Sequence, residues 1–358
     1  MTNAKNYTIA GIFYLSMMFC INASARQQNS TLPDTSGVKS SRATSFIIYS
    51  SVNNLLEFRK MVKQAERLKP FGTVKINIST LADKAFHETP EGGSPWHEYA
   101  NQNPTPFKFF PNPKIAPFLP AGFVKKNRQL MMDKARILKE NGMEAAFFSY
   151  EPNFLPAAFF DAYPEMMGPR VDHPRRSRQK AFAPCIDVKD TREMYASMME
   201  EMLRSVPEIT AFSFKTNDAG AGICWSDWLY SGANGPTHCK NMNTGDRTRS
   251  LFNAFREGAA RAGRDLSIYL NEANSNFSDR EKEDIQRNLP PGCYYRSTEN
   301  AEIKNLSTPM SVGYPVTGIF NPVAFLNDLE TVNADRGQSI FITFRAAYDR
   351  ANEDAQTM

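Results

Sequence analysis

Histidine and cysteine are scarce in this chain, with four and five residues respectively among 358. Metal-dependent hydrolases usually hold their ion with a cluster of histidines, so we expect neither a metal nor another cofactor. A strong charge of one sign is also missing, because the formal net charge is only +4. The one basic run, Arg170 to Lys180, has no interleaved aromatic residues. Nucleic acid is therefore not an expected partner.

Long hydrophobic runs are absent as well. The apolar stretch Tyr7 to Ile21 is too short for a convincing membrane span. Lys5 precedes it and the small residues Ala23-Ser24-Ala25 follow it, which is the pattern of a cleaved signal peptide. We predict that residues 1–25 are removed. The mature protein would be secreted or periplasmic, with no membrane attachment.

The cysteines of the mature chain have two readings. Such a compartment permits disulfides, and Cys224 and Cys239 lie in one loop that they could close. Two reduced thiols are an equally open alternative. A zinc site is less favoured, because only His238 is nearby.

The fold follows from eight short apolar segments, most of them separated by helical patterns, after a polar and flexible lead-in over residues 26–44. The predicted strands are 45–51, 73–79, 143–151, 209–215, 266–272, 293–299, one within 311–319, and 339–345. This order predicts a (β/α)8 TIM barrel over residues 45–358. An open doubly wound sheet is the alternative, but the first strand–helix turn lacks GxGxxG.

Two irregularities accompany the barrel pattern. Residues Thr80 to Gly122 form a long, proline-rich insertion after strand two, and its many aromatic residues predict a packed lid beside the site. The sequence also ends thirteen residues after strand eight. Either the barrel closes unconventionally or the sequence is a fragment of a longer one.

The stretch Ile209 to Asn241 is the one around which the chain is organised. A strand there runs into Asn217-Asp218 and then into a glycine-rich loop containing Trp225, Trp228 and Tyr230. A parallel barrel builds its active site from such loops, at the carboxyl ends of its strands.

Strand periodicity selects further candidates. If apolar residues face the helices, the polar residues between them point into the barrel. The inward set predicted in this way is Lys75, Asn77, Ser149, Glu151, Lys215, Asn217, Thr343 and Arg345. Glu272 and Glu299 sit at or just past strand ends, like Asp218.

Several carboxylates beside aromatic rings favour glycoside hydrolysis. That reaction needs a carboxyl group to protonate the leaving oxygen and a second carboxylate as base or nucleophile. The candidate catalytic residues are Asp218, Glu151, Glu272 and Glu299. The candidate substrate-binding residues are Lys75, Asn77, Lys215, Asn217, Trp225, Trp228, Tyr230 and Arg345. Lysine and arginine would favour an acidic sugar.

The run FSFKTNDAGAG, with the later Asn-Gly-Pro of residues 234–236, resembles the strand-four region of α-glucuronidase-type barrels, and more loosely that of β-hexosaminidase-type barrels. The resemblance covers about thirty residues. In α-glucuronidases a Lys-x-Asn run leads into Ser-Glu-Gly, whose glutamate is the general acid. Lys215, Asn217 and Gly220 match, but Ala219 stands at the glutamate position and Asp218 at the serine. The resemblance thus implies an acid shifted to Asp218 or lost.

Three functions therefore compete. The first is a secreted glycoside hydrolase that acts on a poly- or oligosaccharide, which could contain uronic acids. The second is a catalytically inactive carbohydrate-binding barrel. A metal-dependent hydrolase is third, and the lack of a histidine cluster argues against it.

Overall fold

The computed structural model describes residues 16–22, 45–50, 52–83, 99–174, 177–218, 220–271, 276–296 and 339–345. Its centre is a six-stranded sheet in which all neighbouring strands are parallel. The strands, in spatial order, are β2 (Ser45–Ile48), β3 (Thr73–Asn77), β4 (Glu144–Tyr150), β7 (Ile209–Lys215), β8 (Ser267–Asn271) and β9 (Cys293–Arg296). Spatial order equals chain order, as in successive βα units of a barrel. Each strand lies inside its predicted range.

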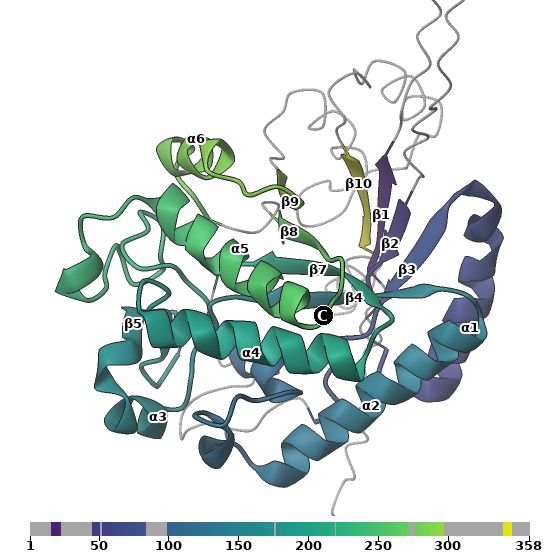
Figure 1. Ribbon diagram of the computed structural model, residues 1–358, viewed down its shortest axis with the longest axis horizontal. Coiled ribbons are helices and arrows are strands. Elements are labelled where there is room, and N and C mark those ends of the chain that lie inside the picture. The colour runs from purple at the N-terminus through teal and green to yellow at the C-terminus, as the bar shows by residue number, and fades with distance from the viewer. Residues whose placement is uncertain are drawn as a thin grey trace, which may run out of the picture.

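Helices connect these strands. They are α1 (Leu55–Ala65), α2 (Ala121–Glu140), α4 (Lys189–Ser205), α5 (Thr244–Arg261) and α6 (Asp279–Arg287), and the short α3 (Ala157–Ala162) follows β4. Helices α1, α2, α4 and α5 lie along one side of the sheet (Figure 1). Each buries an apolar stripe, as Met194, Met198 and Met202 of α4 show.

The two faces of the sheet differ in what they carry. Ile76, Phe147 and Phe212 belong to the large core beneath the helices. Alternate residues point the other way, and there Ile47, Ala146 and Ala211 form a small separate cluster with Tyr49 and Tyr269. We call this second side the inner face.

The described part of the insertion packs on the helix side. It contains the 3₁₀ turns η2 (Tyr99–Gln102), η3 (Pro106–Lys108) and η4 (Ala116–Phe118). Phe107, Phe109 and Phe110 are buried in the main core, and the Phe109 ring meets Phe147 edge to face at 5.4 Å. The predicted lid is therefore wrong for Phe107, Phe109 and Phe110, because their rings are buried in the main core on the helix side.

Two small sheets accompany the central one. Strand β5 (Met167–Arg170) pairs antiparallel with β6 (Phe182–Pro184). Strand β10 (Ser339–Arg345) forms at the predicted eighth strand, but it pairs antiparallel with β1 (Ser16–Asn22). A closed (β/α)8 barrel would need it parallel to its neighbours. Predicted strand seven lies outside the described residues, so barrel closure remains a prediction.

Strand β1 falls within the predicted signal peptide, while the lead-in at 26–44 lies outside the described residues. No helix of the described segments is long and apolar enough to cross a membrane.

Candidate active site

Five aromatic side chains cover the inner face of the sheet. They come from strands β4, β8 and β9 and from the residue that follows β2, and they are Tyr49, Phe148, Tyr150, Tyr269 and Tyr294. Ring centroids lie 5.3 Å apart for Tyr49 and Phe148, and 5.2 Å apart for Phe148 and Tyr150. Tyr269 stacks on Tyr294 at 5.0 Å, and Tyr294 is 47% exposed. We call these five residues the aromatic face. Flat rings with polar tips suit a ligand with alternating apolar and hydroxylated surfaces.

Lys215 ends β7 at the carboxyl edge of the aromatic face. Its ammonium lies 5.6 Å from the centroid of the Tyr150 ring and 5.8 Å from that of Phe148. A cation over two rings is held by their negative faces. Burial, and then the nearby charge of Asp218, raise the pKa of the Tyr150 phenol, so Tyr150 stays neutral.

Asp218 lies at the same edge, three residues beyond the end of β7. Its Oδ1 accepts a hydrogen bond from the Tyr230 hydroxyl at 3.3 Å, and Tyr230 stacks on the His173 imidazole at 4.7 Å. Asp218 is half-buried and Tyr230 is 43% exposed. The edge therefore combines a carboxylate, a cation and aromatic rings.

Two predicted binding residues instead hold the backbone around the site. Asn217 adopts a left-handed conformation, with φ of 53°, which asparagine tolerates better than most residues. Its side chain is buried and bonds Ser226 Oγ, the Asn276 carbonyl and the Ile223 N–H.

Asn77 is also buried, and it bonds the Ser50 carbonyl and the Phe148 N–H. Both are positioning residues.

The predicted inward orientation of Ser149 and Glu151 is wrong. Glu151 is fully buried on the helix side, where it accepts hydrogen bonds from Thr105, from Tyr195 of α4 and from Ser149 itself. Burial raises the Glu151 pKa to about 7, because its effect outweighs that of these hydrogen bonds, which lower the pKa. Strand β4 is apolar on both faces, with Phe147 on one and Phe148 on the other, so its polarity does not fix which way its side chains point.

Lys75, a predicted substrate-binding residue, does not lie at the carboxyl edge with Lys215 and Asp218. Lys75 does face inward, but it bonds Thr210 Oγ1 at 2.8 Å and Glu144 at 2.9 Å. Glu144 begins β4 and Thr210 is the second residue of β7, so this cluster lies at the amino end of the sheet. Burial opposes ionisation of Glu144, but the bonds from Thr210 and Lys75 outweigh it and lower its pKa.

The two loop tryptophans differ in their surroundings. Trp225 packs against a buried cysteine cluster, and its indole N–H donates to the Pro236 carbonyl at 2.9 Å. Trp228 is 55% exposed and remains available for a ligand. Cys224 and Cys239 are free thiols. Glu272 and Glu299 lie outside the described residues. For Thr343 and Arg345 only the backbone is described. The roles of all four residues therefore stay predictions.

Sequence reasoning missed the tyrosines. Tyr269 shares its strand face with Asn271, and Tyr150 shares its face with Phe148, opposite the buried Phe147. The usable signal is a tyrosine in or next to each of four strands, at Tyr49, Tyr150, Tyr269 and Tyr294. A phenol has a polar tip, so it can mark an inner face that a count of charged residues overlooks.

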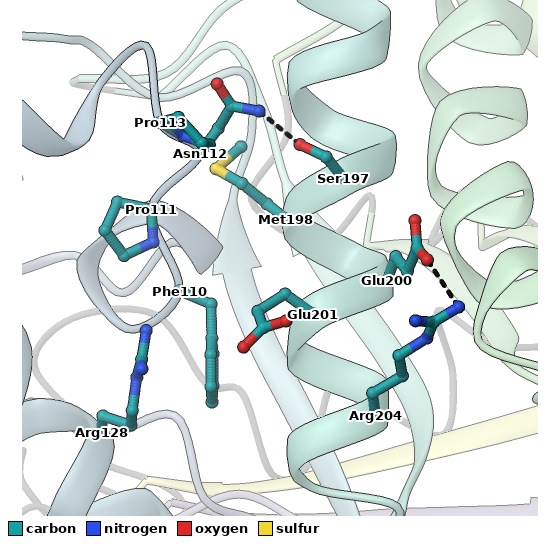
Figure 2. Close-up of a pocket in the computed structure, with 10 residues that line it drawn as sticks. All are labelled: Phe110, Pro111, Asn112, Pro113, Arg128, Ser197, Met198, Glu200, Glu201 and Arg204. Atoms are coloured by element: carbon teal, nitrogen blue, oxygen red, sulfur yellow. Dashed lines mark hydrogen bonds and ion pairs between the residues drawn. The ribbon is translucent and has the colours of Figure 1, made fainter.

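A separate hollow of about 360 Å³ lies on the helix side, between α4, α2 and the loop of residues 110–113 (Figure 2). One ion pair lies in its wall, where Arg204 bonds Glu200 at 2.7 Å. Arg128 covers the Phe110 ring at 4.5 Å. None of the predicted catalytic residues lines it.

Comparisons with known proteins do not show a family for this chain. No protein-family model and no curated protein matches the chain. Similar solved structures include the α-galactosidase TtGalA from Thermus thermophilus, at 12% identity and a TM-score of 0.34 over 61% of this chain and 34% of that one. A GH27 β-L-arabinopyranosidase from Geobacillus stearothermophilus has 13% identity and a TM-score of 0.38, over 67% and 49%. A GH20 module of the pneumococcal exo-β-D-N-acetylglucosaminidase StrH has 10% identity and a TM-score of 0.36, over 79% and 63%.

The chain thus spans less than two thirds of each of these proteins. All three are glycoside hydrolases. Likeness at TM-scores of 0.34 to 0.38 does not bear on activity, so function has to be argued from the site itself.

Proposed function

We propose that the carboxyl edge of the inner face binds a carbohydrate and cleaves one of its glycosidic bonds, with Asp218 as the carboxyl group that acts on the leaving oxygen. The observation that carries the proposal is the aromatic face ending at Lys215 and Asp218. Rings of this kind stack on the apolar faces of sugars. Asp218 supports the proposal as the carboxyl group at this edge, and the Tyr230 hydroxyl donates a hydrogen bond to it at 3.3 Å.

The ligand class follows from the charges. Lys215 is the cation placed over two rings of the aromatic face, so we propose a uronic-acid-containing oligosaccharide as the preferred substrate. A glycosidase needs a second carboxylate. Glu151 faces the helices and does not serve. We propose Glu272 or Glu299, which follow the last residues of β8 and β9 in the sequence.

A screen of the purified protein against aryl glycosides and uronic-acid oligosaccharides tests this proposal. Asp218→Asn should cost about 2–5 kcal/mol of transition-state stabilisation with poor leaving groups and little with very good ones, because the latter need no proton. Asp227→Asn is the matched control. That carboxylate belongs to the same loop but bonds Ser278 and Arg280.

The competing function is a carbohydrate-binding protein without catalysis. The displacement of Glu151 to the helix side favours it, since it removes one candidate carboxylate from the edge. This alternative would be established if calorimetry detects binding of an oligosaccharide that the protein does not hydrolyse under any condition of the screen. A protein that neither binds nor cleaves any sugar in the screen would overturn both functions.

We also propose export with removal of residues 1–25. The pairing of Ser16–Asn22 with Ser339–Arg345 is a competing use of the same segment. N-terminal sequencing of the protein from an exporting host decides between them. A mature start near Arg26 supports export, and an intact Met1 supports retention.

A further inference from the structure

Three buried cysteines meet behind the loop that carries Trp228 and Tyr230. Cys185 precedes α4, while Cys224 and Cys239 come from the two ends of that loop. The Sγ atoms of Cys185 and Cys239 are 3.8 Å apart. These three sulfurs and one Asp187 carboxylate oxygen all lie within 4.8 Å of one another. Segments distant in sequence thus bring four ligand atoms to one point.

The geometry points to a structural zinc site formed by Cys185, Cys224, Cys239 and Asp187. Zinc–sulfur bonds of about 2.3 Å at tetrahedral angles place two sulfurs about 3.8 Å apart. The Cys185–Cys239 separation has that value. A disulfide would need the sulfurs at about 2.05 Å. Zinc binding releases the three thiol protons to solvent as the sulfurs become thiolates.

Asp187 supplies an independent observation. Its Oδ1 is buried and has no hydrogen-bond partner among the described residues. Its Oδ2 accepts from Arg247 Nε at 3.0 Å, and the two side chains are 3% and 1% exposed. A buried, unsatisfied carboxylate oxygen is costly. A metal ion would satisfy it.

Arg247 also suits an anionic metal site. Its guanidinium donates to the Cys224 carbonyl at 2.7 Å and to the Cys239 carbonyl. One buried cation therefore holds both loop ends and the carboxylate that would bind the metal. This is the supporting shell that protein metal sites usually have. The scarcity of histidine does not exclude this site, because its ligand set contains no histidine.

His238 is the competing fourth ligand. Its Nε2 lies 3.6 Å from Cys185 Sγ, a distance that also fits two ligands of one tetrahedral zinc ion. The imidazole is exposed, however, and it does not belong to the group of mutually close ligand atoms. We therefore assign the fourth position to Asp187.

Elemental analysis of the protein, purified without chelators or a metal-affinity tag, tests the site. We expect about one zinc per chain. Zinc should be lost in Cys224→Ser and kept in Cys293→Ser, the matched control, because Cys293 is a buried thiol on β9 outside the cluster. Chelation should lower the melting temperature of the wild type and of Cys293→Ser, and leave Cys224→Ser unchanged.

Cobalt substitution then identifies the fourth ligand. The wild type should show thiolate-to-cobalt charge transfer and the visible bands of a tetrahedral ion. Asp187→Asn should shift these bands and weaken cobalt binding at least tenfold, and His238→Ala should do neither. The reverse result would replace Asp187 by His238.

Two results would overturn the site altogether. One is wild-type protein without zinc that also fails to bind added Zn²⁺ or Co²⁺. The other is a thiol titration of the unfolded protein that finds two thiols missing because two of Cys185, Cys224 and Cys239 are joined by a disulfide.

Discussion

The ammonium of Lys215 lies 5.6 Å from the centroid of the Tyr150 ring, on the side of the sheet away from the helices. This contact places a cation at the carboxyl end of the aromatic face, over the rings of Tyr150 and Phe148. An elongated ligand bound along the aromatic face would therefore place an anionic group at the Lys215 end. An acidic group bound there would interact with Lys215 while its neighbouring sugar ring stacks on Tyr150 or Phe148.

Lys215→Met should therefore weaken acidic ligands selectively. We expect the Kd of a uronic-acid oligosaccharide to rise about 5- to 30-fold, which is about 1–2 kcal/mol for a partly buried charge interaction. The neutral counterpart should change by less than about twofold. Titration calorimetry with the two ligands measures both.

Lys240→Met is the control for this experiment. Lys240 also lies over a ring, 5.0 Å from the centroid of Trp225, but on the loop that packs against the cysteine cluster. Its loss should leave both affinities unchanged. Equal weakening of acidic and neutral ligands by Lys215→Met would show that the residue supports the fold of the site and does not read charge.

Strand and helix periodicity predicted most of the fold. Six predicted strands became neighbours in chain order, because a buried parallel strand needs a helix after it and both carry strong apolar patterns. Face assignment succeeded for β7, where Phe212 and Phe214 alternate with Ser213 and Lys215. It failed for β4, whose Phe147 and Phe148 lie on opposite faces and give no alternation.

The site was less predictable than the fold for a physical reason. Sequence polarity does not say whether a buried charge binds a ligand or a neighbour in the protein. Lys75 pairs with Glu144, and Glu151 bonds Tyr195. Both partners are distant in sequence, and only the packed structure brings them together. The cysteine cluster was missed for the same reason, since Cys185 is remote in sequence from Cys224 and Cys239.

Glu151 should make the stability of the protein depend on pH. Its pKa rises from 4.5 to about 7 on folding, because burial disfavours the charged form. Between these values the folded state binds more protons than the unfolded state, so stability is full below pH 4.5 and falls as the pH rises to 7. The loss should be about 3 kcal/mol, which Glu151→Gln should abolish. Urea unfolding at several pH values measures it.

Glu144→Gln is the matched control on the same strand. The pKa of Glu144 is lowered, so its contribution is present at neutral pH and is lost only as the pH falls through the acid range. Between pH 5 and 7 this variant should therefore differ from the wild type by a nearly constant amount. If Glu151→Gln also keeps a constant difference, the Glu151 carboxyl group is not buried as described.

Arg247→Met should destabilise the protein strongly, whether or not the metal proposal holds. The guanidinium is 1% exposed and pairs with Asp187, and it also bonds the Cys224 and Cys239 carbonyls. Removal leaves a buried carboxylate and two carbonyls without their donor, which costs about 3–5 kcal/mol. Urea unfolding measures the free energy of unfolding.

Arg249→Met is the control, on the exposed side of the same helix beside Asp246. It should cost less than about 1 kcal/mol.

Gly258 lets α5 approach α4 closely. A Cβ atom at this position would lie 2.4 Å from the Ala196 carbonyl oxygen and 2.6 Å from Met199 Cβ. Gly258→Ala gains about 1 kcal/mol of helix propensity, but it forces the two helices apart. The overpacking should cost more than that gain, for a net loss of about 1–3 kcal/mol. Thermal unfolding of the variant measures the balance.

Gly122→Ala separates the two effects. Gly122 lies in the first turn of α2, and a Cβ atom there would have no heavy atom within 4 Å outside its own helix. Only the backbone term applies, so this variant should be neutral or up to about 1 kcal/mol more stable. If Gly258→Ala were equally neutral, α4 and α5 would have to shift without loss of packing. That outcome would contradict close packing between α4 and α5, because a close-packed core of methionine and phenylalanine is destabilised by one added methyl group.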